Sequence, residues 1–177
     1  MSRAGWFAVL GMLAACSTEP PLVSAPGYRD TGVMISSIVS FDPARFAGTW
    51  YEVASYPTPV RQGCSDTQLR VTTAPEGLGL VESCRRDGGV STVAGTARVT
   101  GPGRLEVQSG GTSASYWVLW VDEGYRTVVL GTPSGRDGRI LNRDPVIPAD
   151  RLAAAREILD FNGYDLSALR ITPQGGG

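Results

Sequence analysis

The sequence predicts an all-β fold, an eight-stranded antiparallel up-and-down β-barrel with one C-terminal α-helix packed outside. Three observations indicate an antiparallel barrel or sandwich, and a meander of eight strands followed by one late helix favours the closed barrel. Short segments of alternating apolar and polar residues follow one another, turn-forming residues separate them, and only one segment has clear helical periodicity. The 177 residues include 23 Gly and 12 Pro, which is typical of a chain with many turns. Hydrophobic residues make up 42% of the chain, enough for the core of one domain.

The eight expected strands follow one another in chain order. Turn residues stand between them at Pro75-Glu76-Gly77, Asp87-Gly88-Gly89 and Gly101-Pro102-Gly103. Strands that short turns connect run antiparallel, so the series can close into a barrel, which is either filled by side chains or holds one ligand. The barrel domain is expected over residues 41–172, with strands at 49–56, 66–72, 78–85, 90–100, 105–109, 116–122, 125–132 and 139–142.

One segment, residues 149–161, has the pattern of an α-helix. Pro148 precedes it, and its apolar residues recur at helical spacing, at Leu152, Ala155 and Leu159. We expect this helix to pack on the outside of the sheet. A short strand at 168–172 is expected to pair with a barrel edge, and residues 173–177 are expected to form a disordered tail.

The composition excludes several kinds of active site, because the chain contains neither His nor Lys. Without His there is no Ser-His-Asp or Cys-His pair and no His-ligated zinc or haem. Without Lys there is no P-loop lysine and no Schiff base. The net charge of −1 gives no basic surface for a nucleic acid. An active site would have to use carboxylates, Tyr, Arg or Cys. We expect no catalytic residues, no metal, no cofactor and no nucleic-acid partner.

Residues 1–15 have the layout of an export signal. Arg3 gives a positive start, and the apolar run that follows is about half the roughly 20 residues of a membrane-spanning helix. The run ends in Leu-Ala-Ala-Cys16, which resembles the lipobox of bacterial lipoproteins. This resemblance implies a lipid anchor on Cys16, and Ser17 after it implies the outer membrane, with the domain facing the periplasm. The alternative is an ordinary secretory signal with an incidental cysteine.

Residues 16–40 connect the lipidated cysteine to the barrel. They are rich in Ser, Pro, Thr and Gly and have no sustained period, which predicts a flexible tether. Ile35, Ile38 and Val39 are apolar residues that can pack back onto the edge of the domain.

Three motifs in the expected barrel resemble those of the lipocalin family. The first is Gly48-Thr49-Trp50, at the start of the first strand. The second is Val-Asp-Glu-Gly-Tyr-Arg at 121–126, between the sixth and seventh strands, and the third is Ile-Leu-Asn-Arg-Asp-Pro at 140–145, which ends the eighth. Their order and the late helix agree with the family over residues 40–172. The nearest group is that of the bacterial outer-membrane lipocalins, which are also similar to apolipoprotein D.

The resemblance implies structural roles for the motif residues. Gly48 and Trp50 belong to the closed end of the barrel, where Trp50 is expected to plug the interior. Arg143 is expected to lie across the indole as a cation–π partner, and Asp122 to cap the neighbouring turn.

The alternation of side chains along a strand predicts which residues face the interior when Trp50 is the reference. Residues 116–121 are apolar on both faces, so their phase stays open. For each inward apolar residue, core packing is the alternative to ligand contact. The apolar candidates for ligand contact are Ala54, Tyr56, Leu69, Val71, Leu105, Val107 and Leu141.

Two polar residues, Glu52 and Arg139, also fall at inward positions. A carboxylate is costly to bury alone, so the two side chains either pair with each other or with water, or Arg139 binds an anionic group of the ligand. Relatives typically carry an aromatic residue at the position of Arg139. The hypothesis is an amphiphile with its acyl tail in the cup and an acidic head group near Arg139.

Cys64 and Cys84 remain as an even pair in an oxidising compartment, and they flank the hairpin of the second and third strands. We predict a disulfide between them near the barrel rim. The strand phases place Cys64 outward and Cys84 inward, so the bridge requires a bulge or an irregular strand end. The alternative is a thiolate nucleophile, which would lack a nearby His or Lys to lower its pKa.

These features together predict a lipid-anchored binding protein and not an enzyme. Its ligand would be a small hydrophobic molecule, a fatty acid or lysophospholipid, which is transported or stored by burial in the barrel cup. A second possibility is an envelope protein-interaction module with a filled barrel. A third is an enzyme on the same barrel that uses Glu52, Tyr56 or Tyr116 as acid or base.

Overall fold

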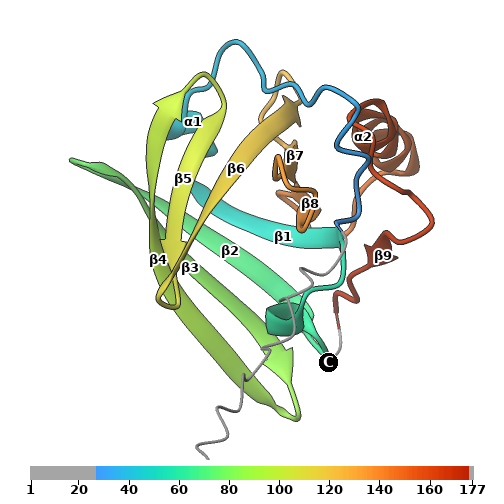
Figure 1. Ribbon diagram of the computed structural model, residues 1–177. Coiled ribbons are helices and arrows are strands. Elements are labelled where there is room, and N and C mark those ends of the chain that lie inside the picture. Colours follow the sequence, from blue (N-terminus) through green and yellow to red (C-terminus); the bar gives the residue numbers. More distant parts are fainter. Residues whose placement is uncertain (1–26, 176–177) are drawn as a thin grey trace, which may run out of the picture.

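Eight antiparallel strands of the computed structural model close into a barrel (Figure 1), and the structure describes residues 27–175. β1 pairs with both β2 and β8, which closes the sheet, and β9 pairs with the far end of β1. The predicted fold class is confirmed. The strands are β1 (Gly48–Ser55), β2 (Ser65–Ala74), β3 (Gly77–Arg86), β4 (Gly89–Gly101), β5 (Arg104–Ser109), β6 (Thr112–Val121), β7 (Thr127–Gly131), β8 (Gly138–Asn142) and β9 (Arg170–Ile171).

The expected helix is present as α2 (Ala149–Phe161), on the outside of the barrel (Figure 1). Two short helical turns were not expected, α1 (Pro43–Phe46) and η1 (Pro59–Arg61). α1 forms because the Asp42 carboxylate accepts a hydrogen bond from the backbone N–H of Ala44 at its start. Neither α-helix of the described chain has the length and hydropathy that a membrane span requires.

β1 contains a bulge that the sequence did not reveal. Glu52 pairs with Leu141 on β8, but Ala54 pairs with Ile140, so one extra residue of β1 lies between them. A bulge of this kind reverses the phase of the residues that follow it. Ala54 and Tyr56 were predicted to face the cup, and this prediction is wrong, because they pack outside the barrel.

The apolar side chains form two clusters, one inside the barrel and one between the barrel wall and α2. The outer cluster joins Ala54 and Tyr56 to Ala155, Leu159 and Tyr164. The two clusters share the barrel wall, so burial under α2 holds the strands that the inner cluster packs against. The inner cluster includes the predicted inward residues Trp50, Leu69, Val71, Leu105 and Leu141.

Trp50 and Arg143 close one end of the barrel. The Trp50 side chain is fully buried and its indole N–H donates to the carbonyl of Phe46 at 2.8 Å. The Arg143 guanidinium lies 3.7 Å from the centre of the indole ring and donates to the carbonyls of Thr49 and Ala47, each at 2.9 Å. This close approach requires a glycine at Gly48, where φ is +110° and a Cβ would lie 2.9 Å from an Arg143 nitrogen.

Asp122 organises the turn between β6 and β7. Its carboxylate accepts hydrogen bonds from the backbone N–H groups of Arg126 and Thr127 at 2.6 and 2.7 Å, as expected for a turn cap. These bonds and the Arg126 side chain lower the pKa of Asp122, although its partial burial acts in the opposite direction.

Parts of the predicted tether and tail lie against the barrel. The Tyr28 ring stacks on Tyr56 at 5.0 Å, and the N–H of Ile38 donates to the carbonyl of Val118 at 2.9 Å. The Gln174 amide donates to the carbonyl of Glu52 at 2.7 Å. Ile35 and Ile38 pack on the barrel as the sequence allowed, whereas Val39 is 92% exposed. The contacts of Tyr28 and Gln174 were not expected of a flexible tether and a disordered tail. Cys16 and the signal at 1–15 lie outside the described residues.

Arg143→Lys should lower the free energy of unfolding by about 2 kcal/mol, because an ammonium group cannot span several carbonyls while stacking on an indole. Urea denaturation measures the change. Arg126→Lys at the same end is the control. Arg126 is mostly exposed, and the expected change is below about 0.5 kcal/mol. Equal losses in both variants would contradict the role assigned to Arg143.

Candidate functional site

A cavity of about 280 Å³ occupies the barrel interior near the end opposite Trp50. β2 to β6, β8 and the η1 turn supply its walls, so residues far apart in sequence meet there. Its volume is just below the range of about 300–1,000 Å³ that is typical of small-molecule sites. The apolar part of the lining consists of Val60, Leu69, Leu80, Val93, Val107 and Ala114. The polar part includes Arg61, Glu82, Ser83, Ser91, Ser109, Thr112, Tyr116 and Arg139.

The predicted ligand contacts divide into four groups. Leu69, Val107 and Arg139 line the cavity. Val71, Leu105 and Leu141 lie in the inner core. Glu52 is buried beside the Arg61 and Arg139 side chains, and Ala54 and Tyr56 lie outside the barrel.

Sequence reasoning did not propose Arg61, Leu80 or Glu82 as ligand contacts. The alternation of Leu78, Leu80 and Glu82 along β3 carries a signal that could have found the last two. Arg61 lies in the turn η1, where no strand alternation applies, so only the folded structure places it in the cavity.

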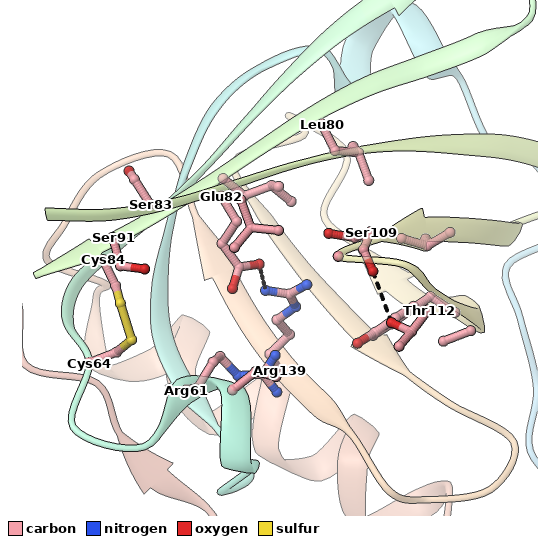
Figure 2. A pocket seen from close by; sticks show the side chains of 17 residues that line it. Arg61, Cys64, Leu80, Glu82, Ser83, Cys84, Ser91, Ser109, Thr112 and Arg139 are labelled. Atoms are coloured by element: carbon pink, nitrogen blue, oxygen red, sulfur yellow. Dashed lines mark hydrogen bonds and ion pairs between the residues drawn. A yellow bond between two sulfur atoms is a disulfide. The ribbon is translucent and has the colours of Figure 1, made fainter. Parts of the chain in front are cut away.

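Two arginines and three carboxylates form an ion network at the cavity. Arg139 donates to Glu82 Oε2 at 2.6 Å, and Figure 2 shows the Arg139 side chain extending across the interior toward Glu82. Arg61 forms an ion pair with Asp137. Glu52 Oε2 lies 3.6 Å from a nitrogen of Arg61 and 3.6 Å from one of Arg139. The five groups carry two formal positive and three formal negative charges, so their sum is −1.

Arg139 and Glu52 thus stand close together, as one of the two sequence hypotheses expected. The direct hydrogen bond of Arg139, however, goes to Glu82, which lies on β3 across the barrel from β8. The remaining carboxylate oxygen of Glu52 accepts a hydrogen bond from the Thr172 hydroxyl at 2.9 Å.

The network sets the protonation of its members. Burial alone would raise the pKa of Glu82, but the guanidinium of Arg139 outweighs it and lowers this pKa. Burial would likewise raise the pKa of Asp137, and Arg61 and Arg139 lower it. The Tyr116 hydroxyl donates to Asp137, and burial is the main reason why the pKa of Tyr116 is raised. Both carboxylates are therefore ionised at neutral pH, while Tyr116 stays protonated.

Cys64 and Cys84 form a disulfide with a Cα–Cα distance of 5.4 Å, so the predicted bridge is confirmed. It lies on the cavity wall (Figure 2) and joins the segment before β2 to β3. The expected irregularity is present, because Cys64 precedes β2 and the pairing of β2 with β3 shifts between Ser65 and Gln68. The bridge holds the segment that carries η1 close to the cavity.

Comparisons with known proteins agree on one family. A family model described as a lipocalin-like domain matches residues 41–174. Apolipoprotein D of Macaca fascicularis is 29% identical over 147 residues, which are 76% of this chain and 78% of the relative. Temperature-induced lipocalin-1 of Arabidopsis thaliana is 28% identical over 144 residues, 73% of this chain and 77% of the relative.

A solved structure supports the same fold. Insecticyanin from the tobacco hornworm Manduca sexta has a TM-score of 0.68 against this chain at 17% identity. The match covers 85% of this chain and 88% of that one.

Asp137→Asn should lower the free energy of unfolding at pH 7 by about 3 kcal/mol, because the buried guanidinium of Arg61 loses its partner. Acid should affect the two proteins differently. The pKa values of Asp137 and Glu82 lie below their ordinary values of 3.8 and 4.5. Wild type therefore has the full stabilisation above pH 4.5 and loses it as the pH falls further.

In Asp137→Asn one of these two carboxylates no longer titrates, so the loss of stability on acidification should be smaller. Urea denaturation between pH 3 and 7 measures both slopes. Glu76→Gln, in the exposed turn between β2 and β3, is the control and should keep the wild-type slope. If the stability of wild type and of Asp137→Asn depended equally on pH, Asp137 would not be the ionised partner of Arg61.

Proposed function

This chain belongs to the lipocalin family, whose members typically bind small hydrophobic ligands, and from that premise we propose that it binds a single-chain amphiphile. The ligand class is a fatty acid or a lysophospholipid, which the protein transports or stores in the barrel cup. The proposed mechanism is burial of the acyl chain, with one polar contact that fixes the orientation of the ligand.

The observation that carries this proposal is the cavity, which is closed at one end by Trp50 and lined by apolar side chains from several strands. Each methylene that leaves water for such a surface contributes about 0.8 kcal/mol. A volume of about 280 Å³ favours one acyl chain over a ligand with two.

The cavity also bears on the two alternative functions. A barrel that serves only as an interaction module would have its interior filled by side chains, whereas this one leaves space among Leu69, Leu80 and Val107. For an enzyme, Tyr56 lies on the wrong side of the wall. The Tyr116 hydroxyl is held by Asp137 with a raised pKa, which makes it a poor base. Binding without reaction is the function these positions favour.

A lipid anchor on Cys16 is the second part of the proposal. The apolar run before Leu-Ala-Ala-Cys16 and the serine after it support lipidation and placement at the outer membrane, with the barrel facing the periplasm. An anchored carrier would meet its amphiphile at the membrane surface, where such molecules partition.

Leu80→Trp should weaken ligand binding at least tenfold, because Leu80 lines the cavity and an indole would occupy the space of the acyl chain. Displacement of the fluorescent probe N-phenyl-1-naphthylamine by decanoate or 1-decanol measures the affinity. Val81→Trp is the matched control, since Val81 is the next residue on β3 and is exposed. It should bind both ligands like wild type. Equal affinities of the two variants would count against the cavity as the binding site, and mass spectrometry of the natively purified chain would identify its own ligand.

Cys16→Ser should release the full chain from the membrane fraction of a bacterial host, because a serine cannot carry the thioether-linked lipid of a lipoprotein. Fractionation followed by immunoblotting measures the distribution, and mass spectrometry of wild type should find acyl chains on residue 16. Cys84→Ser, which removes the barrel disulfide, should stay in the membrane fraction. A Cys16→Ser chain that remains membrane-bound would exclude this anchor.

A further inference from the structure

The ion pair between Glu82 and Arg139 crosses the interior of the barrel. Arg139 projects from β8 and Glu82 from β3, and both side chains line the cavity (Figure 2). The pair joins an Arg139 nitrogen to Glu82 Oε2 at 2.6 Å. A carboxylate therefore already occupies the position on Arg139 that the acidic head group of a ligand would take.

Glu82 is the member of the network that is easiest to exchange. Its side chain is 27% exposed, whereas those of Glu52 and Asp137 are 2% and 11% exposed. Glu52 is held by the Thr172 hydroxyl, and Asp137 by both Arg61 and Tyr116. Among the described residues the Glu82 carboxylate hydrogen-bonds to Arg139 alone, so it can turn away from Arg139 without breaking a second hydrogen bond.

Arg139 can accept a different carboxylate. Its side chain is only 9% exposed and stays in the cavity, with Tyr116 near one face of the guanidinium. Glu82 engages only one terminal nitrogen of Arg139, Nη1, through one carboxylate oxygen. A guanidinium presents two parallel donors to a planar carboxylate, so an incoming carboxylate can form the two-pronged contact that Glu82 does not make.

We propose that Glu82 holds the head-group position on Arg139 in the unliganded cup, and that an anionic amphiphile binds by displacing it. This inference rests on the proposed function, and it assigns Glu82 as the residue that sets head-group selectivity. The formal charge of the network is already −1, so a second free carboxylate opposes the binding of an anion. An uncharged amphiphile of the same chain length does not compete with Glu82.

Glu82→Gln tests the proposal with two ligands of equal chain length, decanoate and 1-decanol. Removal of the competing carboxylate should raise the affinity for decanoate at least tenfold and leave that for 1-decanol within twofold. Glu76→Gln removes the same charge from the exposed β2–β3 turn and should leave both affinities within twofold of wild type. Glu82→Asp keeps the charge but shortens the reach to Arg139, so it should raise decanoate affinity by a smaller factor and serves as a second variant if Glu82→Gln fails to fold.

A double-mutant cycle with Arg139→Gln separates displacement from a change of charge. In the Arg139→Gln background, Glu82→Gln should raise decanoate affinity by no more than about threefold, because the guanidinium for which Glu82 and the ligand compete is absent. A tenfold rise in decanoate affinity in both backgrounds, or no rise in either, would overturn the proposal. Binding of 1-decanol by the same variants would still support the proposed function. If neither ligand displaces the probe from any variant, the proposed function itself fails, and the inference with it.

Discussion

The double pairing of β1, with β2 along one edge and with β8 along the other, is the interaction on which the cavity depends. A closed sheet has no free edge there. About half of its side chains point into the barrel, where solvent can enter only from the ends. Trp50 and Arg143 then close one end, where β1 begins. Closure therefore produces the apolar interior, and Trp50 fills it at the end where β1 begins.

Sequence patterns predicted the strand order and most strand boundaries because alternation and turn chemistry are local signals. They failed where contacts between residues distant in sequence determine the local structure. Nothing marks Val53 as the bulge that turns Ala54 and Tyr56 to the outer face, since a valine is an ordinary strand residue. The first residues of β6, Thr-Ser-Ala-Ser at 112–115, are too polar to indicate a strand, yet they pair with β5 along their whole length. Pairing across the hairpin overrides their composition.

The cavity was predictable only in part, for a similar reason. Phase along single strands placed Leu69, Val107 and Arg139 correctly, because each lies on a regular stretch. The partners of the arginines could not be derived in this way. Arg61 and Asp137 lie in loops that strand phase does not describe, and the contact of Arg139 with Glu82 spans the interior of the barrel. Sequence could thus indicate that a buried arginine needs a partner, but not which carboxylate supplies it.

Two arginines near the ends of the barrel show how partners separate a structural role from a binding role. Arg143 donates to backbone carbonyls, which are fixed by the strand and turn geometry, so moving its guanidinium would leave several acceptors unpaired. Arg139 donates to one flexible carboxylate that is partly exposed to the cavity. Exchanging that carboxylate for another leaves Arg139 paired with an anion, whereas no ligand could replace the carbonyls around Arg143. An arginine therefore has a structural role at one end of the barrel, whereas at the other end a ligand can replace the partner of an arginine.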